Sequence, residues 1–400
     1  MQALVRACHL SFGVSYYKAA LPARIVAHGV VADEVGFWDL LYGEGLGEFY
    51  FRNGLPVPDR PGFGHPDNLA QRSDAPATTP AAAGPPHEAT LVLIGGGKDS
   101  GLVAEIVRAS GVRAAALALG DSPWMERSAA AAGLLLHRVE RRIDPLLFAL
   151  NASGAWNGHV PVSACIAAVS LLVARAAGFT DVLVGNERGA DHANLLWQGR
   201  EVNHQWSKSS RYERALQDWC GRHVGVWPRY ASLLRPLGEV RIAREFAHCP
   251  DQHPSFTSCN RNFRLDPASR PERWCGECAK CVFVALILSP HLDEAQAHAI
   301  FGQDILARAA NRPHLEALLG LADVKPWDCV GTPQECWLSL LALHRQGRLP
   351  AALADLPARA PAALQGGGFA AAWEHELQAD PAPTLTAVWR ARLDAYLGTG

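Results

Sequence analysis

The chain has 400 residues, enough for two or three domains that each have a core of their own. Its hydrophobic and charged fractions, 49% and 19%, are those of an ordinary globular protein. Its net charge of −2 excludes a bulk electrostatic attraction to nucleic acid or to an anionic membrane, so any anionic ligand must be held by a local site.

The N-terminal segment has no targeting signal that we recognise. Residues 1–22 lack the long apolar core and the small-residue cleavage site of a signal peptide. The most apolar stretch, residues 164–174, is too short to span a bilayer and predicts a buried helix. We therefore expect a cytoplasmic protein without a membrane partner.

The first part of the chain predicts a small domain followed by a linker. Apolar and aromatic runs with turn signals, as in GLGEFYFRNGLPVP at 45–58, predict a small N-terminal region over residues 1–70 that contains β-strands as well as helices. Residues 71–87 are rich in Pro, Ala and Thr and have no apolar periodicity, which is typical of a linker.

Residues 88–255 alternate strand-like and helix-like stretches. Strands are expected within 89–95, 112–120, 134–140 and 179–187, and helices at 99–109, 123–133 and 161–178. This alternation predicts an α/β fold, a mostly parallel sheet with helices on both faces. Ligands of such sheets bind beyond the carboxyl ends of the strands, where residues 95–100, 120–122 and 185–194 fall.

The first of these segments is a candidate phosphate loop. Gly95, Gly96 and Gly97 lie between a predicted strand and a helix that starts near Asp99, so backbone N–H groups and the helix dipole meet at one spot. It is not a Walker A loop, because Val92 and Asp99 stand where that motif needs glycine and Ser or Thr. A glycine-rich turn without a ligand is the alternative.

Lysine is rare in this chain. Only five of the 37 basic residues are lysine, at positions 18, 98, 208, 280 and 325. This bias suggests a GC-rich coding background, in which lysine persists mostly where a compact, titratable ammonium is needed. Lys98 and Lys208 are therefore candidates for function, and surface lysines without a role are the alternative.

Residues 256–400 are expected to hold a cysteine-bearing segment followed by helices. Four of the ten cysteines cluster as Cys259-x15-Cys275-x2-Cys278-x2-Cys281. Four thiolates at this spacing suit a tetrahedral, structural Zn²⁺. An iron–sulfur cluster and unpaired buried cysteines are the alternatives. The six scattered cysteines are expected to be small buried hydrophobic residues.

The glycine-rich segment resembles a known phosphate loop. IGGGKDS, residues 94–100, is similar to the S-G-G-x-D-S signature of the PP-loop ATP pyrophosphatases, with Gly95 in place of the first serine. The resemblance implies that residues 95–97 and Ser100 bind ATP, that Lys98 neutralises phosphate charge, and that Asp99 helps to hold Mg²⁺.

Longer stretches resemble a single family, the UDP-N-acetylmuramoyl-L-alanyl-L-glutamate epimerases of the MurL type. They run from about residue 13 to residue 331 and include GVSYYKAALP, NASGAWNGHVPVSA, GNERGADHANL, EVNHQWSKS after Arg200, SCNRNF, RWCGECAKC and KPWDCVG. The resemblance implies an ATP- and Mg²⁺-dependent enzyme that adenylates UDP-MurNAc-L-Ala-L-Glu, inverts its terminal L-glutamate and releases AMP and diphosphate.

The epimerase chemistry needs proton transfer on two faces of a carbon atom. EVNHQWSKS supplies His204 and Lys208, which we take as the hypothetical acid/base set; a role of both in binding phosphate or the substrate's γ-carboxylate is the alternative. Glu187 and Asp191 could bind Mg²⁺ or act as bases. His159, just before a predicted helix, could contact the α-phosphate or serve in capping or packing.

Two other functions compete with this interpretation. Another PP-loop adenylating enzyme, such as a deazaguanine nitrile synthase or an amide-forming ligase, would consume ATP and leave the stereocentre alone. A zinc-dependent nucleic-acid-binding protein would bind RNA or DNA in a salt-sensitive manner and release no diphosphate. The small-molecule substrate is preferred over a nucleic-acid partner, and the sequence carries no sign of the oligomeric state.

Overall fold

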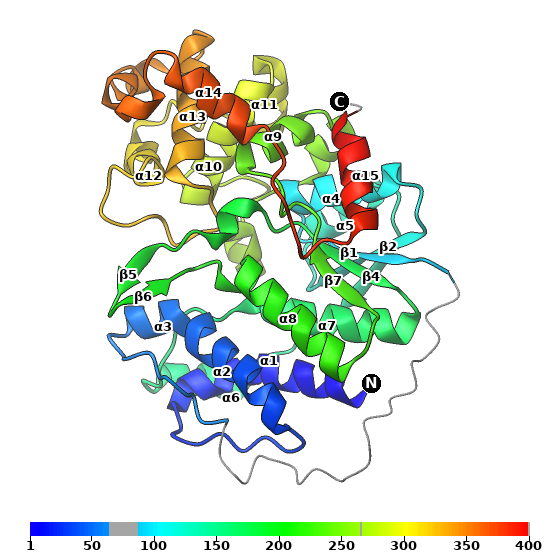
Figure 1. The fold of residues 1–400 in the computed structure, drawn as a ribbon. Coiled ribbons are helices and arrows are strands. Elements are labelled where there is room, and N and C mark those ends of the chain that lie inside the picture. Colours follow the sequence, from blue (N-terminus) through cyan, green and yellow to red (C-terminus); the bar gives the residue numbers. More distant parts are fainter. Residues whose placement is uncertain (64–86, 265, 399–400) are drawn as a thin grey trace. The chain divides into compact units, whose positions relative to one another are not determined.

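The structure is a computed structural model that describes residues 1–63, 87–264 and 266–398 (Figure 1). The chain packs into two compact units, each built from separate chain segments. The first consists of residues 1–91, 140–182 and 195–231, and the second of residues 92–139, 183–194 and 232 onward. Residues 71–86 of the predicted linker lie outside the described residues.

A five-stranded sheet has the strand order β3-β2-β1-β4-β7. Its strands are β1 Thr90–Leu93, β2 Ala114–Leu119, β3 Leu136–Val139, β4 Asp181–Val184 and β7 Arg229–Ser232. β2 and β3 are parallel, with Ala116 opposite Leu136. β7 also runs parallel to β4, because its hydrogen bonds lead from Arg229 N to Thr180 O and from Leu233 N to Val184 O. The predicted α/β class and the four expected strands are thus confirmed; β7 was not expected.

The first unit is mainly helical. Its helices are α1 Gln2–Ala20, α2 Val35–Gly43, α3 Gly47–Arg52, α6 Pro145–Ala152, α7 Val162–Ala177 and α8 Ser210–His223. Two short antiparallel strands, β5 Leu195–Trp197 and β6 Arg200–Val202, form a hairpin. α1 packs along α7, which carries the predicted buried stretch 164–174 and confirms that expectation.

The expected β-structure of the N-terminal region is wrong for its described part. Residues 1–63 contain α1, α2, α3 and short 3₁₀ turns, and no strand. The misleading run at 45–50 is buried without interruption, and such a run has no periodicity that separates a strand from a helix. A better signal was the pair Glu48 and Arg52, which are four residues apart and form a 2.7 Å ion pair on α3.

The second unit surrounds one helix that is buried along its whole length. Its helices are α4 Lys98–Ala109, α5 Pro123–Ala131, α9 Glu239–Ala247, α10 Ala279–Leu288, α11 Glu294–Phe301, α12 Arg312–Leu318, α13 Pro333–Arg345, α14 Gly368–Glu376 and α15 Ala387–Gly398. α10 is buried at every residue and packs against α9, α12 and α13. α4, which follows the glycine loop, packs against α9 and α15 (Figure 1).

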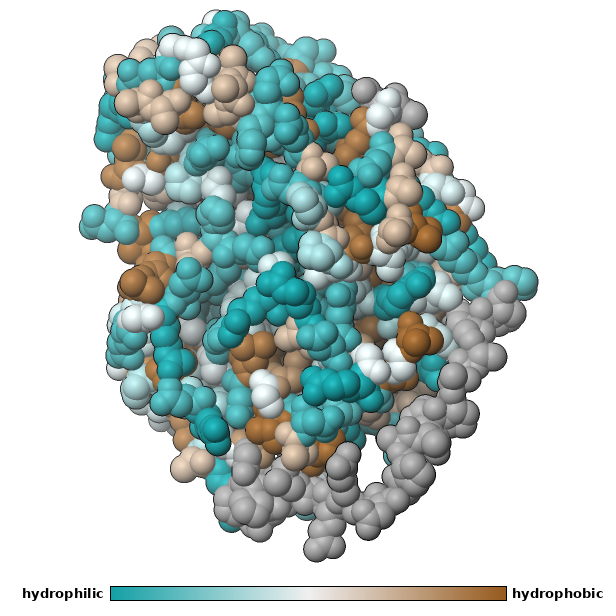
Figure 2. Space-filling view, viewed as in Figure 1, coloured by the Kyte–Doolittle hydropathy of each residue, from teal (hydrophilic) through white to brown (hydrophobic). Residues whose placement is uncertain are grey.

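Apolar residues are spread in small separate patches over the largely hydrophilic face drawn in Figure 2. Singly exposed apolar side chains such as Leu196 and Val226 are usual on a globular domain. Among the described residues, none of the helices has both the length and the apolar character that crossing a membrane requires.

Candidate functional site

The glycine loop lies where the strand order of the sheet reverses. β1 has β2 on one side and β4 on the other, so the loops after β1 and β4 flank the position at which open α/β sheets bind ligands. The two loops touch: a Cβ atom on Gly185 would lie 3.0 Å from the carbonyl carbon and oxygen of Asp99. The three predicted site segments do follow β1, β2 and β4 at their carboxyl ends.

The three glycines of the loop have different surroundings. Gly96 has φ +79°, and a Cβ there would lie 3.1 Å from the main chain of Trp124, so both conformation and space require glycine. A Cβ on Gly97 would lie 3.1 Å from Ser258 Oγ, whereas one on Gly95 would meet nothing within 4 Å. The departure from the PP-loop signature at Gly95 therefore leaves an open position.

This difference predicts the outcome of two matched substitutions. Gly95→Ser should fold with a melting temperature within about 2 °C of the wild type, because the new side chain has room. Gly96→Ser should be destabilised by about 1–3 kcal/mol because of its positive φ and the contact with Trp124. Thermal unfolding checks both; equal melting temperatures for the two variants would contradict the described loop geometry.

Lys98 is the first residue of α4 and is fully buried. Its ammonium group pairs with the carboxylates of Asp99 and Glu239. Burial alone lowers the pKa of Lys98, but the two carboxylates outweigh it and raise the pKa above the usual value. A charged, desolvated ammonium is thus held at the end of the glycine loop.

Glu239 was not predicted from the sequence. It begins α9 and is buried; burial raises its pKa to about 7, with Lys98 opposing this shift and Asp99 and Glu187 adding to it. Its backbone N–H donates to Glu335 Oε1 at 2.6 Å. Glu335 in turn closes the capping box of α13, so the position of Glu239 depends on the helical region far along the chain.

More lysines gather near these carboxylates. Lys280 is buried, donates to the carbonyl oxygen of Cys329 and interacts with the charge of Glu239. Burial lowers the pKa of Lys325, and the charges of Glu187 and Glu335 oppose that shift. None of the five lysines of the chain is exposed.

Predicted site residues Glu187 and Asp191 lie in the loop after β4. Glu187 is buried, and Arg235 Nη1 donates to its backbone oxygen at 2.7 Å, which fixes the loop. Asp191 ends a short 3₁₀ turn and is exposed. Glu187 interacts electrostatically with Glu239 and Lys325, which places it beside the carboxylate that pairs with Lys98.

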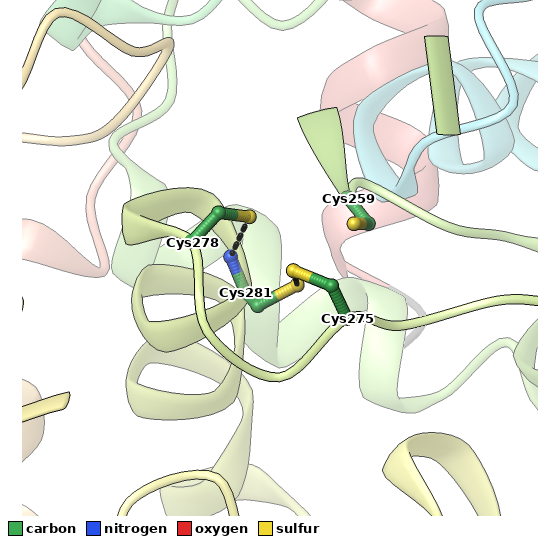
Figure 3. A group of neighbouring side chains, drawn as sticks. All are labelled: Cys259, Cys275, Cys278 and Cys281. Carbon is green, nitrogen blue, oxygen red and sulfur yellow. Dashed lines mark hydrogen bonds between the residues drawn. The ribbon is translucent and has the colours of Figure 1, made fainter. Parts of the chain in front are cut away.

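The four clustered cysteines converge on one point (Figure 3). Their four Sγ atoms all lie within 4.8 Å of one another, and Cys275 Sγ and Cys281 Sγ are 3.7 Å apart. A tetrahedral site with four Zn–S bonds has sulfur–sulfur distances of roughly 3.8 Å. The donor set therefore fits a metal ion of the predicted type.

The local backbone also suits metal binding. The N–H groups of Glu277 and Cys281 point at Cys275 Sγ and Cys278 Sγ, each at 3.4 Å, and such bonds stabilise thiolates. Gly276 has φ +69° between these cysteines. The segment also contacts the glycine loop, since Thr257 N donates to Gly96 O at 2.8 Å just before Cys259.

The other predicted site residues lie in the first unit. His204 follows β6 and His159 precedes α7, yet both Nδ1 atoms face the same oxygen of Glu48, at 2.5 Å and 3.4 Å. Lys208 ends a 3₁₀ turn at Trp206–Lys208 and is half-buried. Glu48 was missed because its region was expected to form strands, although the helical Glu48–Arg52 spacing was visible.

Comparison with known proteins gives two family matches. Residues 1–233 match the MurL N-terminal domain and residues 255–362 the MurL C-terminal domain. A protein of Xanthomonas oryzae pv. oryzae named UDP-N-acetyl-alpha-D-muramoyl-L-alanyl-L-glutamate epimerase is 39% identical over 86% of this chain and 75% of its own length. Proteins of the same name from Salinispora tropica and a Micromonospora species are each 37% identical over 84% of this chain, covering 72% and 74% of their lengths.

Proposed function

Because the chain belongs to the MurL family of UDP-N-acetyl-α-D-muramoyl-L-alanyl-L-glutamate epimerases, we propose that it inverts the terminal L-glutamate of UDP-MurNAc-L-Ala-L-Glu to D-glutamate. We further propose that ATP and Mg²⁺ drive this inversion. The observation that supports the ATP requirement is the glycine loop between β1 and α4. This loop lies where the strand order reverses, and the helix that follows it begins with a buried, charged lysine.

Residues of the second unit bind the nucleotide in this proposal. The N–H groups of residues 95–97 and the Ser100 hydroxyl contact phosphate oxygens, and Lys98 stabilises the negative charge that grows on the diphosphate leaving group. The carboxylates of Asp99 and Glu187 suit Mg²⁺, which prefers oxygen ligands and supplies charge neutralisation when bound. Glu239 keeps Lys98 in place.

Adenylation explains how a side chain can remove the α-proton of glutamate. The α-carboxylate oxygen attacks the α-phosphorus of ATP, and diphosphate leaves. The acyl adenylate lacks the carboxylate charge, so breaking the Cα–H bond and moving its electron pair onto the carbonyl oxygen no longer creates a second adjacent negative charge. A proton then adds to the opposite face of Cα, and water hydrolyses the adenylate to release AMP.

His204 and Lys208 are the proposed acid/base groups. Both belong to the segment between β6 and α8 in the first unit, and both are half-buried, so part of each side chain reaches solvent. A neutral imidazole can accept the α-proton, and an ammonium group can return one to the opposite face.

The cysteine cluster has a structural role in this proposal. Cys259, Cys275, Cys278 and Cys281 would hold Zn²⁺ with no ligand position left open for chemistry. The contact between Thr257 and Gly96 indicates what the metal supports, namely the position of the phosphate loop.

Incubation of the protein with ATP, Mg²⁺ and UDP-MurNAc-L-Ala-L-Glu in D₂O tests the proposal. We expect AMP, diphosphate and D-glutamate with one deuterium at Cα after hydrolysis of the product, because the returning proton comes from a group that exchanges with solvent. Chiral chromatography and mass spectrometry measure both features. AMP release with unchanged, undeuterated L-glutamate would instead indicate another PP-loop adenylating reaction.

A further inference from the structure

The first unit contains a carboxylate that is shared by two imidazoles. Glu48 on α3 is buried, and its Oε2 atom lies 2.5 Å from His204 Nδ1 and 3.4 Å from His159 Nδ1. Its other oxygen, Oε1, accepts a hydrogen bond of 2.7 Å from Arg52 Nε. About a fifth or less of each histidine side chain is exposed, at 21% for His159 and 16% for His204. Three separate chain segments thus meet at one carboxylate.

The charges around Glu48 keep it ionised. Burial raises its pKa, but the hydrogen bond with His204 and the charge of Arg52 oppose burial, and the pKa lies below its usual value. An ionised carboxylate only accepts hydrogen bonds. Each Nδ1 that bonds to it must therefore carry the proton, and this leaves Nε2 as the basic nitrogen of that ring.

The geometry points to Glu48 as the residue that prepares His204 for proton transfer. Resting on the proposed function, we propose that Glu48 is a positioning residue that holds His204 with Nδ1 protonated. His204 Nε2 is then the catalytic base that takes the α-proton of the adenylated glutamate, while His159 steadies Glu48 from the second side. The Cα–H bond breaks, an N–H bond forms at Nε2, and the electron pair moves to the acyl oxygen. The negative charge of Glu48 stabilises the imidazolium that results.

The spacing of the two rings assigns them to the same face of the substrate. The ring centroids of His159 and His204 are 4.6 Å apart, which leaves no room for a tetrahedral carbon between the rings. The proton on the opposite face must therefore come from another group. Lys208, four residues after His204, keeps that role. Burial lowers the pKa of His159 to about 4, so this ring is neutral near pH 7.

Glu48→Gln tests this inference because it preserves the size of the side chain and removes its charge. We expect deuterium exchange at Cα to fall about 10⁴-fold, as kcat does when a carboxylate that orients a catalytic histidine is neutralised. Exchange of labelled diphosphate into ATP, which reports adenylation alone, should stay near the wild-type rate. The primary isotope effect with α-deuterated glutamate should increase, because proton abstraction becomes slower than the other steps.

Asp33→Asn is the matched control. It removes the charge of a carboxylate that lies near another histidine of the same unit, His223. The Asp33 side chain is 57% exposed. The variant should leave deuterium exchange and diphosphate exchange unchanged. If Glu48→Gln does not fold, His204→Ala provides a second test, in which added imidazole should restore deuterium exchange in part.

Each outcome has one interpretation. The role of Glu48 would be overturned if Glu48→Gln kept the wild-type rate of deuterium exchange, or if it lost deuterium exchange and diphosphate exchange equally. A His204→Ala variant that stays active without imidazole would overturn it as well. A second metal ion per chain that disappears in Glu48→Gln would identify a metal site instead. If the wild type itself releases AMP without deuterating glutamate, the proposed function fails, and that result does not depend on any variant.

Discussion

Lys98→Met is expected to lower the rate of ATP conversion to AMP and diphosphate by at least about 10³-fold. Lys98 is fully buried and is the first residue of α4, directly after the glycine loop. Because the side chain is buried, no water molecule can take the place of the missing ammonium group and stabilise the charge that develops on the leaving diphosphate. Steady-state release of diphosphate with saturating UDP-MurNAc-L-Ala-L-Glu measures the effect.

The same substitution also affects folding, so it needs a companion variant. Without the ammonium, the buried carboxylate of Glu239 loses its ion-pair partner Lys98, and a buried charge that has lost its partner costs several kcal/mol. The double variant Lys98→Met/Glu239→Gln removes this charge. We expect it to regain thermal stability and to remain inactive. A folded Lys98→Met variant with the wild-type rate of diphosphate release would exclude Lys98 from catalysis.

Cys281→Ser is expected to abolish tight zinc binding and to lower the melting temperature by more than about 10 °C. Cys281 is buried and belongs to α10, the helix around which the second unit packs. Because the cysteine segment also holds Gly96 through Thr257, ATP-dependent diphosphate release should fall together with the zinc content. Metal analysis, thermal unfolding and diphosphate release on one preparation measure the three effects.

Cys220→Ser is the matched control for the metal site. Cys220 is a buried cysteine of α8 in the first unit and is not a member of the four-cysteine cluster. The variant should keep the zinc content of the wild type and lose little stability. A Cys281→Ser protein that retains one zinc per chain would show that the four cysteines do not form the zinc site.

The parts of the site that lie within one short segment could be predicted from the sequence. The glycine loop and the cysteine cluster are local patterns, since glycines between a strand and a helix and closely spaced thiols each favour one chemistry. Their placement at the carboxyl end of β1 and before α10 follows from the alternation of strands and helices. The family resemblance, which drew on several such segments, is confirmed by the family matches.

The carboxylates that complete the sites could not be found in the same way. Glu239 lies in LGEVRIARE, where an acidic residue in the first helical turn is ordinary, and nothing local marks its contact with Lys98. Glu48 meets His159 and His204 across more than 100 residues of chain. Long-range pairing of this kind depends on tertiary packing, which a single sequence does not display.

The discontinuous course of the chain through the two units constrains the order in which they can form during synthesis. Helix α1 is made before its partner α7, which is more than 140 residues away, and the first unit is complete only after residue 231. Contacts between such distant segments form slowly because a long loop must close before they stabilise anything. Until α7 has been synthesised, the side of α1 that packs against it stays uncovered, and an exposed apolar surface of this kind favours aggregation.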